Sequence, residues 1–248
     1  MGIKWIKLDS IASTNSYITE LMKVGKAKEE LVVTADYQDT GKGQGDHLWQ
    51  SNKGENLLMS ILLHPAFLSA SDQFQLSRLT SLAICDILAS LDLEPVIKWP
   101  NDILTEWGKI AGILIEHAIS GRAISHTIIG IGLNLNQSVF PEFPISATSV
   151  ALEKGNTLSP YKIAEQLLKR ILSRYDQLKN GIGNVLELEY LKRLHLIDQR
   201  SSFLIGGNEC QGVIRGVTHI GELQVEIDGN VKTFGHQEIR LKVSNRRN

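Results

Sequence analysis

The chain has 248 residues, 42% of them hydrophobic, with 26 Lys and Arg against 27 Asp and Glu. This is the composition of an ordinary globular protein, long enough for one catalytic core and a small accessory domain. The formal net charge of −1 excludes a broad positive field, and with it a general binder of nucleic acid or of a membrane surface.

The two cysteines, Cys85 and Cys210, match no metal-ligand spacing. Cys85 falls within an apolar helical pattern, so we expect a reduced thiol in the core. The sequence shows neither the apolar segment of a signal peptide nor an apolar run of 18 residues. We therefore expect a cytoplasmic protein without a membrane partner.

Capping residues and hydrophobic periodicity predict the elements of the first half. Ser13, Thr14 and Asn15 are candidate N-caps of a helix that Gly25 can end. Alternate glycines forbid stable regular structure in the glycine-rich stretch of residues 40–49. The elements expected are, in chain order, a helix over residues 13–25, strands over 31–35 and 56–63, and a helix over 72–91.

The middle of the chain predicts three successive strands, over residues 96–99, 110–118 and 123–135. The connections between these strands are too short for crossover helices, so we expect antiparallel pairing. Two helices then follow, over residues 159–179 and 184–195.

The character of the sequence changes after Gln199. Short β segments separated by glycine-containing turns begin at Ser201, and this spacing predicts a small barrel. We therefore expect two domains, a larger catalytic domain over residues 1–199 and a C-terminal domain over residues 200–248.

The most informative segment runs from residue 98 to 116. Asn101 and Asp102 follow Pro100, which favours a turn, and Lys109 then opens an apolar run too hydrophobic for a surface loop. An unpaired charge at the mouth of a buried strand is costly, so this cation needs an anion beside it. We interpret the segment as an anion-handling active site. The alternatives are a strand-end lysine with a solvated ammonium group and an ordinary turn.

Two glycine patterns are further candidates. In residues 41–49, three glycines let backbone N–H groups surround an anion while Lys42 adds charge, although flexible loop tips look similar. The stretch does not match the phosphate-binding pattern Gly-x-x-x-x-Gly-Lys-Ser/Thr. Trp49 closes over a ligand or anchors the loop. Residues 130–136 alternate glycine and asparagine, which bares one face of a strand to a flat ligand or marks a bulge.

Taken together and in order, these segments resemble the biotin–protein ligases, also called biotin–[acetyl-CoA carboxylase] ligases. The resemblance covers residues 5 to about 240, and the pair of motifs Lys-Trp-Pro-Asn-Asp and Gly-Lys-Ile-Ala-Gly is its most specific part. The matching segments are Ser13 to Asn15, Gln38, and residues 41–49, 98–102, 108–114 and 130–136.

The resemblance implies an α+β fold, with a mixed, largely antiparallel sheet backed by helices and followed by a small SH3-like barrel. It also implies two reaction steps. Biotin and ATP, with Mg²⁺, form biotinyl-5′-AMP and pyrophosphate, and a lysine of a biotin carboxyl carrier protein then takes the biotinyl group. Family members often dimerise by sheet extension. A homodimer is therefore one possible state of this chain, and no residue of the sequence decides between monomer and dimer.

Residue roles follow only by resemblance. The catalytic residues expected are Lys109, Asn101 and Asp102. The residues expected to bind biotin are Ser13, Thr14, Asn15, Gln38, Gly41, Lys42, Gly43, Lys109 and Gly112. The residues expected to bind ATP or the adenylate are Lys42, Gly43, Gln44, Trp49, Asn101, Gly130, Gly132 and Asn134. No direct metal ligand of the protein is predicted.

The glycine loop departs from the family pattern Gly-Arg-Gly-Arg-x-Gly-x-x-Trp. Lys42 and Gln44 replace the two arginines, and Asp46 replaces the later glycine. Lysine keeps the charge but loses the bidentate fork that suits phosphate, and Gln44 removes one charge. We hypothesise that the loop holds biotinyl-AMP less tightly than is usual in the family.

Three other functions share some of these features. A lipoate–protein ligase or octanoyl transferase shares the fold and the strand-end lysine, but the Lys-Trp-Pro-Asn-Asp motif and the glycine loop favour biotin. A biotin-sensing repressor requires an N-terminal DNA-binding domain, and this chain begins at the catalytic core, so no DNA partner is expected. A catalytically dead biotin-binding module conflicts with the retention of Lys109, Asn101 and Asp102.

Overall fold

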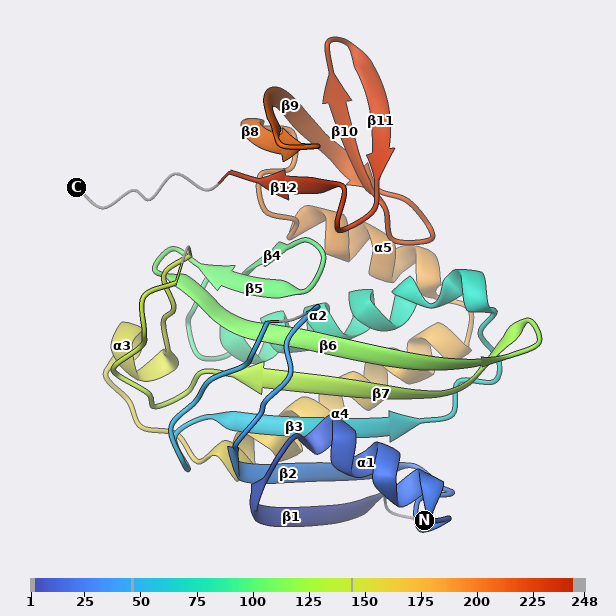
Figure 1. Ribbon diagram of the computed structural model, residues 1–248, viewed down its shortest axis with the longest axis vertical. Helices are drawn as coiled ribbons and strands as arrows, with labels where there is room; N and C mark the ends of the chain where they lie inside the picture. Colours follow the sequence, from blue (N-terminus) through green and yellow to red (C-terminus); the bar gives the residue numbers. More distant parts are fainter. Residues whose placement is uncertain (1–2, 46, 144, 243–248) are drawn as a thin grey trace.

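The structure is a computed structural model that describes residues 3–45, 47–143 and 145–242. A seven-stranded sheet has the strand order β1-β2-β3-β7-β6-β5-β4, and a second sheet of five strands follows it in the chain (Figure 1). The strands of the large sheet are β1 Lys4–Ile11, β2 Leu31–Gln38, β3 Leu57–Leu63, β4 Val96–Lys98, β5 Asp102–Thr105, β6 Gly108–Ser120 and β7 Ala123–Leu133.

The large sheet is mixed but mainly antiparallel, as predicted. Only β1 and β2 pair in parallel among its described strands, because helix α1, Thr14–Lys23, carries the chain back between them. The long hairpin of β6 and β7 pairs in antiparallel register from Ala111 opposite Leu133 to Ser120 opposite Ala123. The predicted antiparallel pairing of the middle strands is therefore confirmed.

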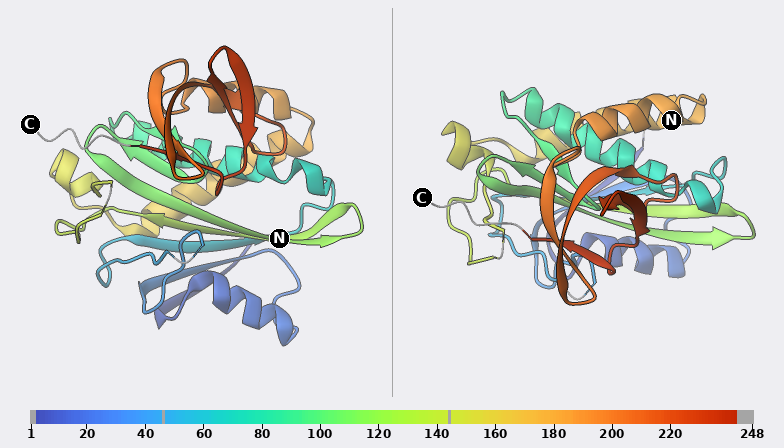
Figure 2. Two further views of the ribbon diagram at one scale, coloured as in Figure 1. Left: turned by 45° about the horizontal axis from the view of Figure 1, so that its top comes forward. Right: turned by 90° about the horizontal axis from the view of Figure 1, so that it is seen from above.

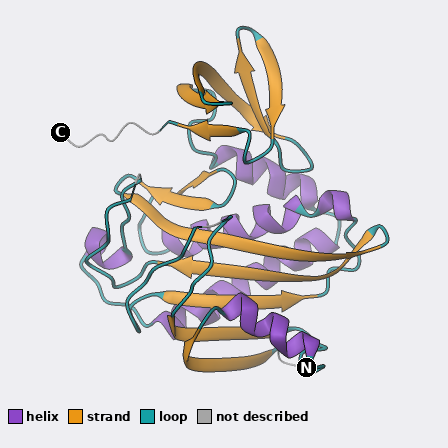
Figure 3. Ribbon diagram, viewed as in Figure 1, coloured by secondary structure: helices purple, strands orange, loops and turns teal. Residues whose placement is uncertain are grey.

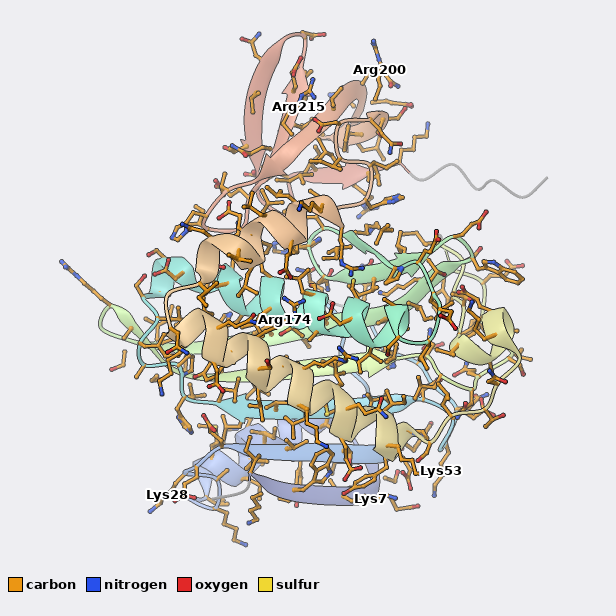
Figure 4. The ribbon with its side chains drawn as sticks, turned by 180° about the vertical axis from the view of Figure 1, so that it is seen from behind. Lys7, Lys28, Lys53, Arg174, Arg200 and Arg215 are labelled. Carbon is orange, nitrogen blue, oxygen red and sulfur yellow. The ribbon has the colours of Figure 1, made fainter. Side chains whose placement is uncertain are left out.

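Helices cover the two faces of the sheet unequally. Helix α1 lies on the front face in Figures 1 and 3, and it packs on β2, β3 and β7. The rear face is covered by α2 Phe74–Ala89, α4 Pro160–Lys179 and α5 Gly183–Lys192, as Figure 4 shows from behind. The larger hydrophobic core lies between the sheet and these rear helices, and it leaves the front face beside α1 open for a site.

The connection from β2 to β3 crosses this open front face (Figure 1). It contains the glycine-rich stretch, in which regular structure is limited to an isolated bridge between Lys42 and Leu48 among the described residues. The expectation that the glycines exclude regular structure is therefore confirmed in substance. The loop extends over β7 and β6, the strands that carry two further glycine-containing motifs.

The C-terminal sheet is antiparallel throughout, with the strand order β11-β10-β9-β8-β12. Its strands are β8 Arg200–Ile205, β9 Asn208–Val217, β10 Leu223–Ile227, β11 Asn230–Phe234 and β12 Ile239–Leu241. It is the small β unit expected after residue 199, but within residues 200–242 no pairing of β11 with β12 closes it into a barrel. Figure 2 shows this sheet above α5 and the upper edge of the large sheet. The domain boundary stays a prediction.

Four short or edge elements escaped the sequence analysis. These are β1, β5, the five-residue helix α3 Val150–Lys154 and a 3₁₀ turn η1 at Ala70–Asp72. The predicted turn after Pro100 exists, but Asp102 already belongs to β5 and pairs with Lys98 across a two-strand hairpin. Among the helices of the described residues, none combines the length and apolarity needed to cross a membrane.

Candidate functional site

A cavity of about 840 Å³ opens on the front face of the sheet. It lies between the glycine loop, the turn after β4, the start of β6, the loop that follows β7, and strand β12 of the C-terminal sheet. Fifteen of the predicted site residues line it. Gly41 does not: a Cβ there would lie 2.5 Å from Trp49 O and 2.9 Å from Gln38 Nε2, so Gly41 supports the wall from behind.

One end of the cavity is closed by a chain of buried polar side chains. The backbone N–H of Thr14 donates to Gln38 Oε1 at 2.8 Å, and the Thr14 hydroxyl lies 3.0 Å from the same oxygen. Ser60 Oγ lies 2.6 Å from both Thr14 Oγ1 and Asn15 Oδ1. Ser13 precedes α1 without a side-chain cap bond, and Gln38 accepts the N–H of the first helical residue, Thr14. The sequence thus brings three elements together to make a polar end.

The orientation of Asn15 is fixed on its other side. Its Nδ2 donates to Glu116 Oε2 at 2.7 Å and to Leu114 O at 3.3 Å, so its Oδ1 must face Ser60. Because an amide oxygen only accepts, the Ser60 hydroxyl donates to it. Gly130 leaves the room that this arrangement needs, since a Cβ there would lie 2.5 Å from Asn15 Oδ1.

The floor of the cavity is formed by glycines of β6 and β7, and the indole of Trp49 lies on it. A Cβ at Gly132 would lie 2.3 Å from Trp49 Cε2, and a Cβ at Gly112 would lie 2.9 Å from Trp49 Cζ3. The bare strand face predicted for residues 130–136 therefore exists, and the flat group on it is this indole. Trp49 is tied to its own loop by its backbone N–H, which donates to Gly41 O at 2.8 Å, while its indole Nε1 is buried without a partner among the described residues.

A cluster of three charges lies at the other end. Lys109 Nζ is 2.6 Å from Asp102 Oδ1, and Lys98 Nζ is 3.1 Å from Asp102 Oδ2. The ammonium of Lys109 also lies 5.6 Å from the Trp49 ring centroid, a cation–π distance. The anion that the sequence analysis required beside Lys109 is thus supplied by the protein itself. Two cations against one carboxylate leave a net positive charge for a bound anion.

Asn101 is held in the turn by the strand beside it. Its Nδ2 donates to Ile113 O at 3.0 Å, and its own carbonyl accepts from the Ile113 N–H at 2.9 Å. Asn134 is buried at the end of β7, where its Nδ2 donates to Thr148 O at 2.9 Å. Its Oδ1 and Thr148 Oγ1 are buried without a partner in the described part of the chain. Of these two residues only Asn134 lines the cavity, so its Oδ1 is a candidate contact for a ligand there.

The loop after β7 docks on the start of β6. The N–H of Lys109 donates to Ser146 O at 2.8 Å, and Thr148 N–H donates to Lys109 O at 3.0 Å. Gly108, at φ +140°, makes room for this contact, because a Cβ there would lie 2.1 Å from Ser146 O. The loop places Phe140 and Phe143 on the cavity wall.

Sequence reasoning missed several residues of the site. They are Ser60, Glu116, Lys98, and three side chains that line the cavity from the C-terminal part of the chain: His195, His236 and Arg240. Burial, and then the nearby charge of Lys98, lower the pKa of His195 below its ordinary value of 6.5. Ser60 left no signal because it sits inside an apolar strand, whereas Lys98 belongs to a motif that the sequence analysis already quoted.

The sequence of this chain matches a family profile and several known proteins. The profile of the biotin/lipoate A/B protein ligase family matches residues 8–134. The bifunctional ligase/repressor BirA of Bacillus spizizenii is 30% identical over 246 residues, which is 97% of this chain and 75% of that protein. The biotin–[acetyl-CoA-carboxylase] ligase of Mycobacterium tuberculosis is 29% identical over 237 residues, 92% of this chain and 86% of that protein.

The fold has close parallels among solved structures. The biotin protein ligase of Aquifex aeolicus, solved in complex with biotin and ATP, superimposes with a TM-score of 0.81 at 23% identity, covering 97% of this chain and 99% of that one. This structural likeness establishes the fold, and the sequence matches establish the family. On those matches, the chain belongs to the biotin/lipoate A/B protein ligase family and is a ligase.

Proposed function

We propose that this ligase activates biotin with ATP as biotinyl-5′-AMP and transfers the biotinyl group to a lysine of a biotin carboxyl carrier protein. The observation that carries the proposal is the chain of polar groups at the closed end of the cavity, Gln38, Thr14, Ser60 and Asn15. A cyclic urea presents both N–H donors and a carbonyl acceptor to such a chain. The dithiolane or alkyl end of lipoate or octanoate offers no hydrogen bond to these polar groups and would only strip water from them, which disfavours those acids.

The opposite end of the cavity suits the reacting groups. A biotin carboxylate and the α-phosphate of ATP are both anionic and repel each other. Lys109 is positioned to lie against both, so it lowers this repulsion and stabilises the charge that develops during attack. Asp102, which is itself paired with Lys98, holds Lys109 in place from the adjoining hairpin.

In the first step, a carboxylate oxygen of biotin attacks the α-phosphorus, and the bond to the β-phosphate oxygen breaks to release pyrophosphate. In the second step, the amine of the acceptor lysine attacks the acyl carbon, AMP leaves with the electron pair of the broken C–O bond, and the amine loses a proton. A mixed anhydride is needed because a free carboxylate is a poor acyl electrophile.

Mg²⁺ would enter with ATP, which it screens and orients through the phosphate oxygens. Within the described residues, no group of three or more His, Cys, Asp or Glu side chains is arranged to hold a metal. Both oxygens of Asp102 lie against lysine ammonium groups. Asn101 Oδ1 is the better candidate oxygen ligand, because the hydrogen bond of this amide is made through Nδ2. This donor set fits an ion held mainly by phosphates and water.

The test is ATP–pyrophosphate exchange with Mg²⁺, run with biotin, with lipoate and with octanoate. We expect exchange that depends on biotin alone. Exchange with lipoate or octanoate instead would move the chain to the lipoyl branch of the family. Absence of exchange with all three acids would refute the adenylation step. Transfer of labelled biotin to a purified carrier domain, with its acceptor lysine changed to arginine as a control, then tests the second step.

A further inference from the structure

A buried arginine lies at the junction of the large sheet, the rear helices and the C-terminal sheet. Arg78 of α2 is 0% exposed. Its Nη2 lies 3.0 Å from Thr218 O, 3.4 Å from Val217 O and 3.5 Å from Glu187 Oε1. Its Nε and Nη1 have no partner among the residues that the structure describes. Burying a charged guanidinium with two unpaired nitrogen atoms costs free energy, which suggests that Arg78 has a role beyond packing.

The two carbonyls that Arg78 contacts lie at the turn between β9 and β10. The turn is closed by bonds from Gly221 N to Thr218 O and from Thr218 N to Glu222 O. It rests on the ring of Phe74, beside which Arg78 also stacks at 5.1 Å. Gly221 has a φ of +98°, and a Cβ there would lie 2.5 Å from that ring. The turn is thus held against α2 at one position.

The same turn reaches the catalytic hairpin. The carbonyl of Gly221 accepts the indole N–H of Trp99 at 2.9 Å. Trp99 is the first residue of the turn that joins β4 to β5 and that also contains Asn101. Strands β4 and β5 have three and four residues and lie at the edge of the sheet. Because a hairpin this short is marginal alone, contacts from outside it decide where Asp102 lies.

We propose that Arg78 and Trp99 are positioning residues, through which the β9–β10 turn of the C-terminal sheet sets the geometry of the catalytic turn. The path runs from Arg78 to the turn at Gly221, to Trp99, and then through the hairpin to Asp102 and Lys109. Neither residue has to touch the reacting atoms. The effect on catalysis rests on the proposed function, whereas the effect on the position of the turn does not.

Amide hydrogen exchange of Ile113 tests the position of the turn without any substrate, because this N–H donates to Asn101 O. In Arg78→Met and Trp99→Phe we expect exchange of Ile113 to rise about tenfold relative to Ile61 in the centre of the sheet. Trp99→Phe keeps a ring of similar shape, so it preserves the fold even where Arg78→Met lowers stability.

Two matched controls separate positioning from general damage. Trp5→Phe removes another indole donor, whose bond goes to Thr34 Oγ1 at 3.3 Å on the far edge of the sheet. Arg174→Met removes an arginine that pairs with Asp86 and Glu189 in the rear layer, at the place labelled in Figure 4. Both controls should leave the ratio of Ile113 to Ile61 exchange, and kcat, at the wild-type value.

Steady-state kinetics supply the second readout. We expect Trp99→Phe to lower kcat for biotinyl-AMP formation about tenfold, while the KM for biotin changes less than about twofold. Misplacing Asp102 and Lys109 slows the chemical step, whereas the polar end of the cavity that would bind the ring of biotin is unchanged. Unchanged Ile113 exchange in both variants overturns the proposal, and so does altered exchange with unaltered kcat in an active enzyme. A wild type that activates no acid refutes the proposed function, while the exchange result still decides the positioning.

Discussion

Lys109 and Asp102 form an ion pair across two neighbouring strands, with Nζ 2.6 Å from Oδ1. Asp102 starts β5 and Lys109 is the second residue of β6, so the hairpin that joins these strands carries both charges. The side chains are 12% and 31% exposed, which leaves the ammonium the more accessible partner. An incoming anion can therefore reach Lys109 while Asp102 continues to orient it.

Changing Lys109→Ala should lower the rate of biotinyl-AMP formation about 1,000-fold, because a fixed charge beside developing negative charge is lost. The fold should persist, since the ammonium lies at the cavity edge rather than in the core. Single-turnover formation of labelled biotinyl-AMP measures the rate, and circular dichroism checks the fold. Near-normal adenylation by this variant would remove Lys109 from the mechanism.

Changing Ser60→Ala should weaken biotin binding about tenfold, since Asn15 Oδ1 and Thr14 Oγ1 both lose a buried partner. Isothermal titration with biotin measures the loss. Ser81→Ala is the matched control, because Ser81 Oγ is buried without a partner within the described residues. Equal biotin affinities for the two variants would show that Ser60 does not contribute to biotin binding at the polar end of the cavity.

Changing Gly112→Val should weaken biotin binding by more than about tenfold, because a side chain displaces Trp49 and narrows the cavity floor. Ala118→Val on the same strand, away from the cavity, controls for the effect of a β-branched residue on β6. Biotin affinity is again measured by titration. An unchanged affinity in Gly112→Val would contradict the assignment of the floor.

The double change Lys42→Arg and Gln44→Arg should slow the release of biotinyl-AMP about tenfold, since arginine grips phosphate bidentately. Both residues line the cavity, whereas Asp46 lies outside the described residues. Stopped-flow dissociation of preformed biotinyl-AMP measures the rate. Equal release rates in wild type and variant would refute the hypothesis that Lys42 and Gln44 weaken the hold of the loop on biotinyl-AMP.

Acid should destabilise the protein partly through two histidines. Burial lowers the pKa of His117 and of His195 below the ordinary 6.5. Below that pH the unfolded chain binds more protons than the native state, so the free energy of unfolding falls as pH drops from about 6.5. Urea unfolding at several pH values should show a smaller fall in the double variant His117→Gln/His195→Gln. A fall as large as that of wild type would be inconsistent with this assignment.

Long elements were predictable because each repeats its pattern over many residues. The apolar spacing of α2 and α4 and the glycine at the end of α1 mark these helices locally. Strand β5 was missed because four residues after a turn carry too little periodicity. Strand β1 was missed because its exposure does not alternate regularly, and its pairing partner β2 lies 27 positions further along.

The sequence by itself indicated the family, through the resemblance carried by its Lys-Trp-Pro-Asn-Asp and Gly-Lys-Ile-Ala-Gly motifs. It also predicted the mainly antiparallel sheet and the segments that gather at the site, because connection length, glycine spacing and charge can be read from a few neighbouring residues. Only the tertiary structure decided that Asp102 pairs with Lys109, that Ser60 completes the polar end, and that Gly221 holds Trp99 across 122 positions. These contacts form only when strands and turns distant in the chain pack together. The sequence around a hydroxyl or a carbonyl does not reveal which distant group it will hydrogen-bond.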